Sequence, residues 1–133
     1  MTLYLDSSAL LKRYIQEPDS ERVDDLLAHD PDLVTARHTV MEVRRNLVRQ
    51  LRPAEATAGR ALFSADMARV SILELDEVTC DLAATIAEQT GVRVLDALHL
   101  GAARRLGTGI SFLTFDVRQA EAARSLGFRV LGS

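Results

Sequence analysis

The stretch "ISFLTFDVRQAEAARSLGFRVLG", Ile110 to Gly132, decides the fold class that we expect for this chain. It opens with a near-continuous apolar run, Ile110–Phe115, which is typical of a strand covered on both faces. Asp116 then suits the N-cap of a helix, "VRQAEAARSL", and Gly127 suits the end of that helix. The last segment, "FRVLG", is again largely apolar. A strand, a helix and a second strand in this order predict two parallel strands joined by a helical crossover.

This alternation extends back to the start of the chain. Further strands are predicted at residues 3–6, 32–36 and 69–75, and the final strand at 128–132. Helices are predicted at residues 7–15, 20–29, 39–51, 54–65, 76–90 and 97–106, and the piece "VRVL" before Asp96 is predicted to be extended. Strands that alternate with helices favour an α/β fold, with a mostly parallel sheet that helices cover on both faces.

The composition sets the broad class of the protein. The chain has 133 residues, of which 47% are hydrophobic and 26% are charged, as expected of one soluble domain spanning residues 1–133. No apolar run approaches the roughly 18 residues that cross a bilayer, and no basic segment precedes the apolar start, so we expect neither a membrane span nor a signal peptide. The single cysteine, Cys80, excludes an internal disulfide and favours the cytoplasm.

The stretch "VLDALHL", Val94 to Leu100, places one carboxylate in an apolar run. Burying an unpaired carboxylate is costly, so Asp96 needs a partner. Capping a helix N-terminus is one role for Asp96, and equally for Asp6 and Asp116. Asp6 ends a predicted strand, Asp116 directly follows one, and Asp96 begins a predicted helix. All three can therefore reach the carboxyl edge of one parallel sheet.

Carboxylates that gather at one edge repel one another, and a divalent cation removes that cost. Asp6, Asp96 and Asp116 offer oxygen atoms alone, without a His or Cys cluster. Such a set favours Mg²⁺, or Mn²⁺, over Zn²⁺. The sequence therefore predicts an acidic metal site, in competition with three separate capping roles.

The helix predicted at residues 39–51 has two contrasting faces. One face is apolar and consists of Val40, Val43, Leu47 and Leu51. The opposite face carries an acid, Glu42, followed by a basic stripe of Arg45, Arg49 and Arg52. Such a stripe would suit a phosphate backbone that passes a metal site. Ion pairing along a solvated face explains it equally well. Arginine makes up every basic residue except Lys12, which fits phosphate binding but also a GC-rich genome.

Histidines and serines are weaker candidates. His99 is more typical of a packed helix residue than of a base, and His38 could face the acidic site. Ser7 and Ser8 follow Asp6 and are candidate nucleophiles, but no histidine stands at a telling spacing from either. Ser8 is therefore expected to hydrogen-bond Asp6 or to cap the first helix.

Four segments together resemble the PIN-domain ribonucleases, above all the VapC toxins of bacterial toxin–antitoxin pairs. The segments are "LYLDSSALLKRY", the helix that carries Glu42, "VLDALHLGAA" and "FLTFDVRQAEAARSLG", and they cover nearly the whole chain in the order of the family. The resemblance places the acidic quartet of the family on Asp6, Glu42, Asp96 and Asp116. Only the helical pair between Glu42 and the third strand has no counterpart that we can match.

The resemblance implies a three-layer α/β/α sandwich with a parallel sheet of about five strands. It also implies Mg²⁺- or Mn²⁺-dependent cleavage of single-stranded RNA segments, inhibition by a small antitoxin, and a homodimer. In this mechanism Asp6 and Asp96 are the main metal ligands, while Asp116 and Glu42 complete the shell and hold or deprotonate the attacking water. The resemblance does not indicate which RNA is cut, or whether the site holds one metal ion or two.

Two other functions stay open at this point. Phosphoryl transfer to an aspartate, as in haloacid-dehalogenase-like phosphatases and receiver domains, also begins with a strand that ends in Asp. It requires a late lysine, whereas Lys12 is the only lysine, and Ser8 stands where the phosphatases have a second Asp. A non-catalytic PIN-like binding module would have the same fold, although all four acids are present in this chain.

Overall fold

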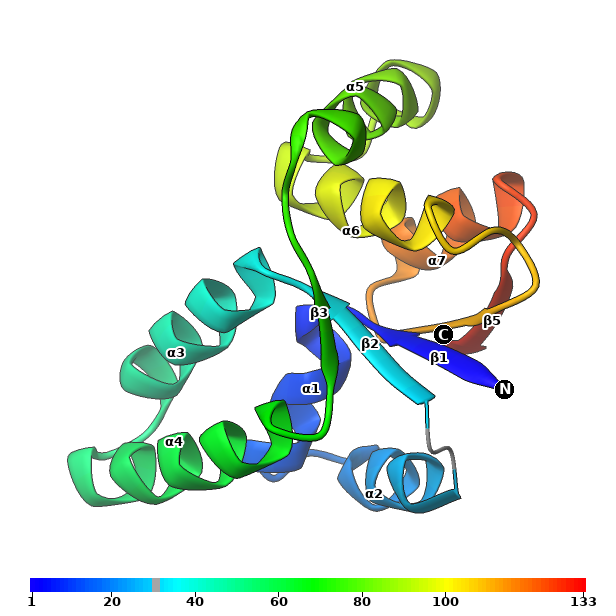
Figure 1. Cartoon of the computed structure of the whole chain (residues 1–133). Coiled ribbons are helices and arrows are strands. Elements are labelled where there is room, and N and C mark those ends of the chain that lie inside the picture. The colour runs from blue at the N-terminus through cyan, green and yellow to red at the C-terminus, as the bar shows by residue number, and fades with distance from the viewer. Residues whose placement is uncertain (30–31) are drawn as a thin grey trace.

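The sheet at the centre of the molecule consists of five parallel strands. The computed structural model describes residues 1–29 and 32–133. The strands are β1 (Thr2–Leu5), β2 (Asp32–Ala36), β3 (Ser71–Leu73), β4 (Ser111–Thr114) and β5 (Arg129–Gly132). They lie in the order β3-β2-β1-β4-β5, and every neighbouring pair is parallel (Figure 1). The predicted parallel sheet of about five strands is confirmed.

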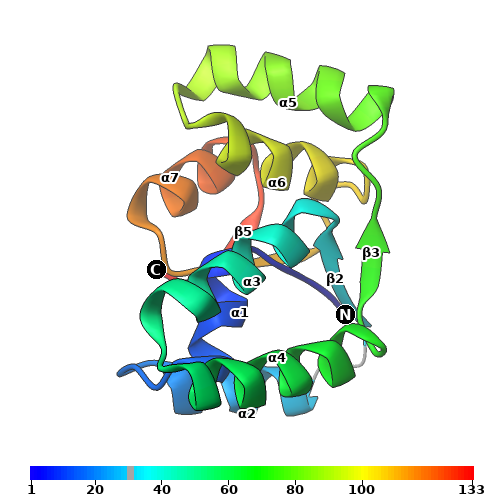
Figure 2. The same cartoon turned by 90° about the vertical axis from the view of Figure 1, so that its left-hand side faces the viewer.

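Helices cover both faces of this sheet and make the molecule three layers thick (Figures 1 and 2). The first face carries α1 (Ser7–Tyr14), α2 (Ser20–His29), α3 (His38–Gln50) and α4 (Pro53–Met67). The second face carries α6 (Val94–Arg104) and α7 (Val117–Ser125), and α5 (Glu77–Thr90) packs on the outer side of α6 (Figure 2). This is the predicted α/β/α sandwich. Among the described residues, no helix is both long and apolar enough to cross a membrane.

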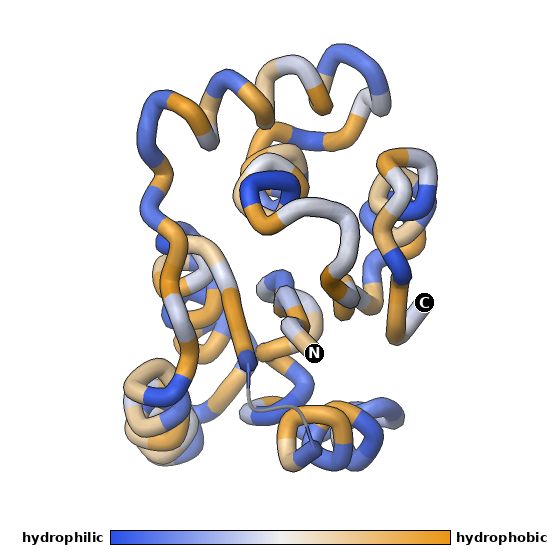
Figure 3. Tube along the Cα trace, turned by 45° about the vertical axis from the view of Figure 1, so that its right-hand side comes forward, coloured by the Kyte–Doolittle hydropathy of each residue, from blue (hydrophilic) through white to orange (hydrophobic). Residues whose placement is uncertain are grey.

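The alternation of side chains along the central strands builds a separate apolar core on each face. Tyr4 and Phe112 point to the side of α5, α6 and α7, where their rings stack with centroids 5.1 Å apart. Leu5 and Leu113 follow them in sequence and point to the side of α1 to α4. All four side chains are fully buried. The strands are therefore apolar on both faces, whereas the helices alternate between apolar and polar residues along each turn (Figure 3).

The start of α6 differs from the prediction. The sequence predicts an extended piece with Asp96 as N-cap, but the helix begins at Val94 and its N-cap is Arg93. Asp96 is thus the third residue of the first turn, where the helix dipole favours a carboxylate. Val94 and Leu95 resemble a strand in sequence, yet they are 71% and 48% exposed on the outside of this turn. The N-cap prediction for Asp96 is therefore wrong.

Asp6 and Asp116 do cap helices, as predicted. The Asp6 carboxylate accepts the backbone N–H of Ala9 in α1, and the Asp116 carboxylate accepts the backbone N–H of Gln119 in α7. Every other predicted element lies within two residues of its observed bounds. The error at α6 therefore concerns one helix start and does not change the order of the elements.

The path of the chain through the sheet fixes the place of the acids. From the central strand β1 the chain moves outward through β2 to β3, and it then returns to add β4 and β5 on the other side of β1. In sheets of this kind, ligands bind beyond the carboxyl ends of the strands at the point where the strand order reverses. Asp6 follows β1 and Asp116 follows β4, so both acids lie at this point.

The close packing of α6 against α5 depends on Gly101. A Cβ atom at this position would lie 2.9 Å from the backbone N of Ala83 and 2.9 Å from the backbone O of Thr79.

We expect Gly101→Ala to lower the free energy of unfolding by about 1–3 kcal/mol, because the two helices must separate. Gly109→Ala is the matched control, since no atom lies within 4 Å of its Cβ position. Urea unfolding measures both variants, and wild-type stability of Gly101→Ala would contradict the expectation.

Candidate active site

Asp6 is a buried carboxylate that hydrogen bonds hold from three directions. Its side chain is only 3% exposed. The hydroxyl of Ser8 donates to it at 2.7 Å, the backbone N of Ala9 at 3.0 Å, and the hydroxyl of Thr114 at 2.5 Å. Burial raises the pKa of Asp6, and the neighbouring His99 and these hydrogen bonds offset that effect only in part. The predicted hydrogen bond from Ser8 is confirmed.

Two hydroxyl groups join the segments that follow β1 and β4. Thr114 donates to Asp6 and accepts the backbone N–H of Asp116 at 3.1 Å. Ser8 also donates to Asp6 and accepts the backbone N–H of Phe115 at 3.0 Å. These bonds hold the backbone of Asp116 at the end of β1. Its carboxylate remains exposed and caps α7.

Asp96 lies beside these two acids but is held differently. In the described part of the chain, no hydrogen bond reaches its carboxylate; its backbone O accepts the side-chain amide of Gln119 at 3.1 Å. Burial raises the pKa of Asp96, and the negative charge of Asp116 raises it further. The charges of Asp6 and Glu42 act in the same direction. The four acids of the predicted quartet therefore share one electrostatic environment, and Asp96 is the member without a hydrogen-bond donor.

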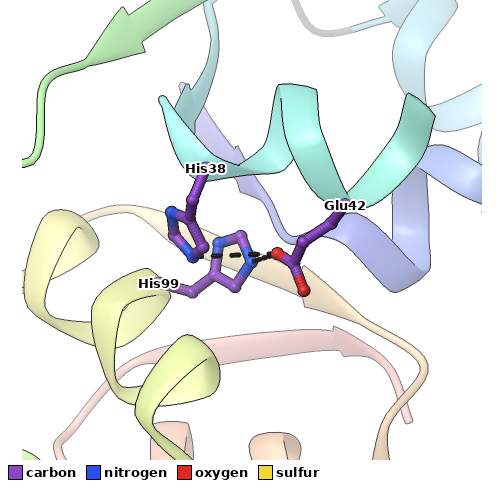
Figure 4. A group of neighbouring side chains, drawn as sticks. All are labelled: His38, Glu42 and His99. Carbon is purple, nitrogen blue, oxygen red and sulfur yellow. Dashed lines mark hydrogen bonds and ion pairs between the residues drawn. The ribbon is translucent and has the colours of Figure 1, made fainter. Parts of the chain in front are cut away.

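Glu42 is fixed through one of its two oxygens. Oε1 accepts the Ser7 hydroxyl at 2.5 Å and lies 2.8 Å from Nε2 of His99 and 3.7 Å from Nε2 of His38 (Figure 4). Burial alone would raise the pKa of Glu42, but the hydrogen bonds from His99 and Ser7 outweigh it and lower that pKa. Glu42 is thus an ionised carboxylate at neutral pH. None of these contacts involves Oε2.

His99 takes part in the site, which the sequence did not predict. Its Nδ1 lies 2.8 Å from the hydroxyl of Tyr4, and its Nε2 faces Glu42 and also lies 3.2 Å from the Ser7 hydroxyl. Burial and the charge of Asp6 raise the pKa of Tyr4 well above its usual value, so its hydroxyl keeps its proton and can donate to Nδ1. Nε2–H then donates to Glu42. The sequence did contain one sign of this role, because His99 lies three positions after Asp96 and therefore on the same helix face.

Two members of the basic stripe of α3, Arg45 and Arg49, line a groove between α3 and α4. The groove has a volume of about 830 Å³ and is lined by Arg44, Arg45, Leu47, Val48, Arg49, Leu51, Pro53, Ala56, Thr57 and Arg60. In the described residues these four arginines form no ion pair. Ion pairing along the helix face therefore does not explain the stripe, since Glu42 binds His99 and Ser7 instead. The arginines remain available to phosphate groups.

The predicted metal ligands suit a hard, hydrated cation. Asp6, Asp96 and Asp116 supply oxygen atoms alone. Burial is the main cause of the raised pKa of Asp96, and the negative charge of Asp116, which a cation would neutralise, adds to it. Among the described residues, these three acids cannot each contribute an oxygen such that all three oxygens lie within 4.8 Å of one another. Mg²⁺ retains several waters and needs only one or two direct carboxylate ligands, so this wider spacing fits it.

Known families and proteins resemble this chain along nearly its whole length. The PIN domain family matches residues 3–125. Ribonuclease VapC46 of Mycobacterium tuberculosis is 35% identical over 130 residues, which cover 97% of this chain and 95% of the relative. Ribonuclease VapC47 of the same species is 32% identical over 131 residues, which cover 95% of this chain and 93% of the relative. The chain therefore belongs to the PIN-domain family and groups with its VapC members.

Solved structures share the fold at lower identity. FitAcB from Neisseria gonorrhoeae superposes with a TM-score of 0.74 at 20% identity, covering 98% of this chain and 96% of that one. VapC20 of M. tuberculosis, described as a toxin that cleaves the sarcin-ricin loop, gives a TM-score of 0.71 at 20% identity and covers 99% and 98%. DNA-bound VapBC from Salmonella typhimurium gives 0.73 at 18% identity and covers 98% and 97%. The PIN-like fold expected from the sequence is confirmed.

Burial of the Asp96 carboxylate beside other acids predicts that removing its charge stabilises the metal-free protein. A raised folded pKa means that the stabilising contribution of Asp96 exists at low pH and is lost as the pH rises through that pKa. Asp96→Asn should therefore raise Tm by a few degrees at pH 7.5 in EDTA, and by less at pH 4. Millimolar Mg²⁺ should raise the wild-type Tm and so reduce the difference in Tm between Asp96→Asn and the wild type.

Thermal melting of both proteins in EDTA and in Mg²⁺ measures this effect. Asp81→Asn is the control, because Asp81 is an exposed acid on α5 and should melt like the wild type in both buffers. A clearly lower Tm for Asp96→Asn in EDTA would assign Asp96 a structural role in the first turn of α6.

Proposed function

We propose that this protein is a metal-dependent endoribonuclease that cleaves single-stranded or looped RNA. The observation that carries the proposal is the contrast between Asp96, which lacks a hydrogen-bond donor, and Asp6 and Glu42, which are fixed by several. A carboxylate left free beside fixed carboxylates suits metal binding better than a capping role. The curated relatives, which are named ribonucleases, support the same reaction.

In this proposal Asp6, Asp96 and Asp116 hold the cation, with Mg²⁺ preferred and Mn²⁺ as an alternative. When bound, the ion lowers the pKa of a water molecule and neutralises charge on the phosphodiester. Glu42 accepts the proton of the attacking water. Ser7 and His99 both bind Oε1 of Glu42, so this oxygen is fixed while Oε2 is left to take the proton. His99 is a positioning residue, and Tyr4 sets the tautomer that it needs.

The groove between α3 and α4 is proposed to guide the RNA backbone. It lies along the helix that carries Glu42, and four unpaired arginines line it. Single-stranded RNA is preferred because its flexible backbone can enter such a site, whereas a duplex buries its base edges.

The partners and the location follow from the same family. FitAcB, VapBC and a Klebsiella pneumoniae toxin–antitoxin complex are structural neighbours, and their descriptions support a small antitoxin as the partner that inhibits this protein. We further propose that residues 1–133 act as one PIN-like domain, that the protein forms a homodimer, and that it works in the cytoplasm, where its RNA substrate is found.

The alternative of phosphoryl transfer to Asp6 finds no support. Ser8 uses its hydroxyl to fix Asp6, and the only lysine, Lys12, pairs with Glu17 and lies 4.9 Å from the ring centroid of Phe115. A non-catalytic PIN-like module remains the alternative, and the cleavage assay below separates it from the proposed enzyme.

Asp6→Asn and Asp96→Asn should each reduce RNA cleavage by at least about 100-fold, because each removes a ligand of the cation. The assay incubates purified protein with total RNA and Mg²⁺, and sequencing maps the cut ends. Asp81→Asn should cleave like the wild type, since this exposed acid lies on α5. Wild-type cleavage by either site variant would refute the metal site, and no cleavage by the wild type on any RNA would favour a binding module.

Replacing Arg45 and Arg49 together by alanine should weaken RNA binding and flatten its salt dependence. Each lost phosphate contact lowers the slope of log affinity against log salt by about 0.7 for a single strand. The matched control replaces Arg104 and Arg129, which are equally exposed but lie near the amino ends of the strands. Fluorescence anisotropy with a short RNA in Ca²⁺ measures both pairs. An unchanged slope for the first pair would remove these arginines from the RNA path.

A further inference from the structure

A second cluster of metal-ligand atoms lies beside the acidic site. His38, Glu42 and His99 each offer one ligand atom, and these atoms all lie within 4.8 Å of one another. Both histidines are buried, and their rings lie with centroids 4.0 Å apart. Figure 4 shows both rings directed at the same carboxylate, one from α3 and the other from α6. Two imidazoles and one carboxylate form a common ligand set for Zn²⁺.

The spacing of these atoms is close to that of a tetrahedral site. Metal–ligand bonds of about 2.1 Å place the ligands of tetrahedral Zn²⁺ about 3.4 Å apart. Oε1 of Glu42 lies 3.7 Å from Nε2 of His38 and 2.8 Å from Nε2 of His99, so the two distances bracket this value. Shifts of about half an ångström at side-chain ends would therefore admit the ion, and a water molecule or the Ser7 hydroxyl can complete the shell.

We propose that His38, Glu42 and His99 form a regulatory site for Zn²⁺, distinct from the all-oxygen site of Asp6, Asp96 and Asp116. Imidazole nitrogen suits Zn²⁺ and other late transition metals, whereas Mg²⁺ prefers oxygen ligands. The two ligand sets therefore select different ions, although they lie side by side.

Binding at His38 exchanges one interaction for another. Its Nε2 now lies 3.0 Å from the backbone O of Leu95, and its buried Nδ1 has no hydrogen-bond partner. Coordination through Nε2 moves the ring proton to Nδ1, so the number of unsatisfied ring nitrogens stays the same. The Leu95 carbonyl lies in the first turn of α6, where a helical N–H also serves it. At His99 the Nε2 proton must likewise move to Nδ1, which then donates to the oxygen of the Tyr4 hydroxyl.

A metal ion in this cluster would inhibit RNA cleavage, a step that rests on the function proposed above. It would engage the oxygen of Glu42 that Ser7 and His99 now fix, and would draw this acid away from the attacking water. It would also place positive charge close to the acidic site, since His99 lies three positions after Asp96 on the same face of α6. Binding of Mg²⁺ to the acidic site would weaken as a result.

Calorimetric titration with ZnCl₂ tests the site without using activity. We expect the wild type to bind one Zn²⁺ with micromolar or tighter affinity, and His38→Gln and Glu42→Gln each to lose about 10- to 100-fold. His29→Gln and Cys80→Ser are the matched controls, because these exposed residues are the remaining histidine and the free thiol. Both controls should bind like the wild type, and Asp96→Asn should retain the site with only a small loss of affinity, because Asp96 is a neighbouring charge and not a ligand.

Three results would overturn the inference: no Zn²⁺ binding by the wild type, undiminished binding by His38→Gln and Glu42→Gln, or loss of binding in Asp96→Asn. Thermal melting checks that each variant is folded. If His38→Gln does not fold, the binding measurement on Glu42→Gln tests the site instead. Absorption of the Co²⁺-loaded protein reports nitrogen ligation independently.

The activity arm adds Zn²⁺ to Mg²⁺-supported cleavage. The wild type should be inhibited, while His38→Gln, scaled to its own zinc-free rate, should resist. If the protein binds Zn²⁺ at the cluster but never cleaves RNA, the proposed function is refuted and the metal site stands. If the cleavage rate is the same with and without bound Zn²⁺, the regulatory role is refuted.

Discussion

A buried carboxylate, Asp6, joins the ends of the two central strands. The hydroxyls of Ser8 and Thr114 both donate to it, and each in turn accepts a backbone N–H from the segment after β4. Burial makes this charge costly, so it is stable only while the donors stay in place. The positions of Asp116 and of α7 therefore depend on Asp6. A residue at the start of the chain thus sets the geometry of one near its end, and the acidic edge exists only in the complete sheet.

Local pattern was sufficient for most of the fold. Apolar strands, caps at Asp6 and Asp116, and glycines after helices predicted the order of elements and the parallel sheet. The start of α6 failed because Val94 and Leu95 are apolar yet exposed, and an exposed apolar pair at a helix start resembles a strand. No rule of spacing could reveal this, since only the tertiary structure shows which residues stay in solvent.

The candidate site was predicted less completely than the fold. The quartet of acids came from the positions of strand ends and from a family resemblance, and its catalytic role stays a prediction. The bonds that distinguish the acids escaped the sequence, because they join residues far apart in the chain: His99 to Glu42, Tyr4 to His99, Thr114 to Asp6. Glu42 appeared to belong to a solvated, arginine-paired face, but a buried imidazole holds it. Hydrogen-bond partners of this kind are a property of packing.

The distance along the chain between the two strand ends also separates them in time during synthesis. Asp6 is made before Thr114, and their bond spans 108 positions. At about 5–20 residues per second, the ribosome needs roughly 5 to 20 seconds to connect them. The acidic edge therefore cannot assemble on a nascent chain until the segment that carries Thr114 has been made. A nuclease built in this order has an incomplete site while the segments between its two central strands are being synthesised.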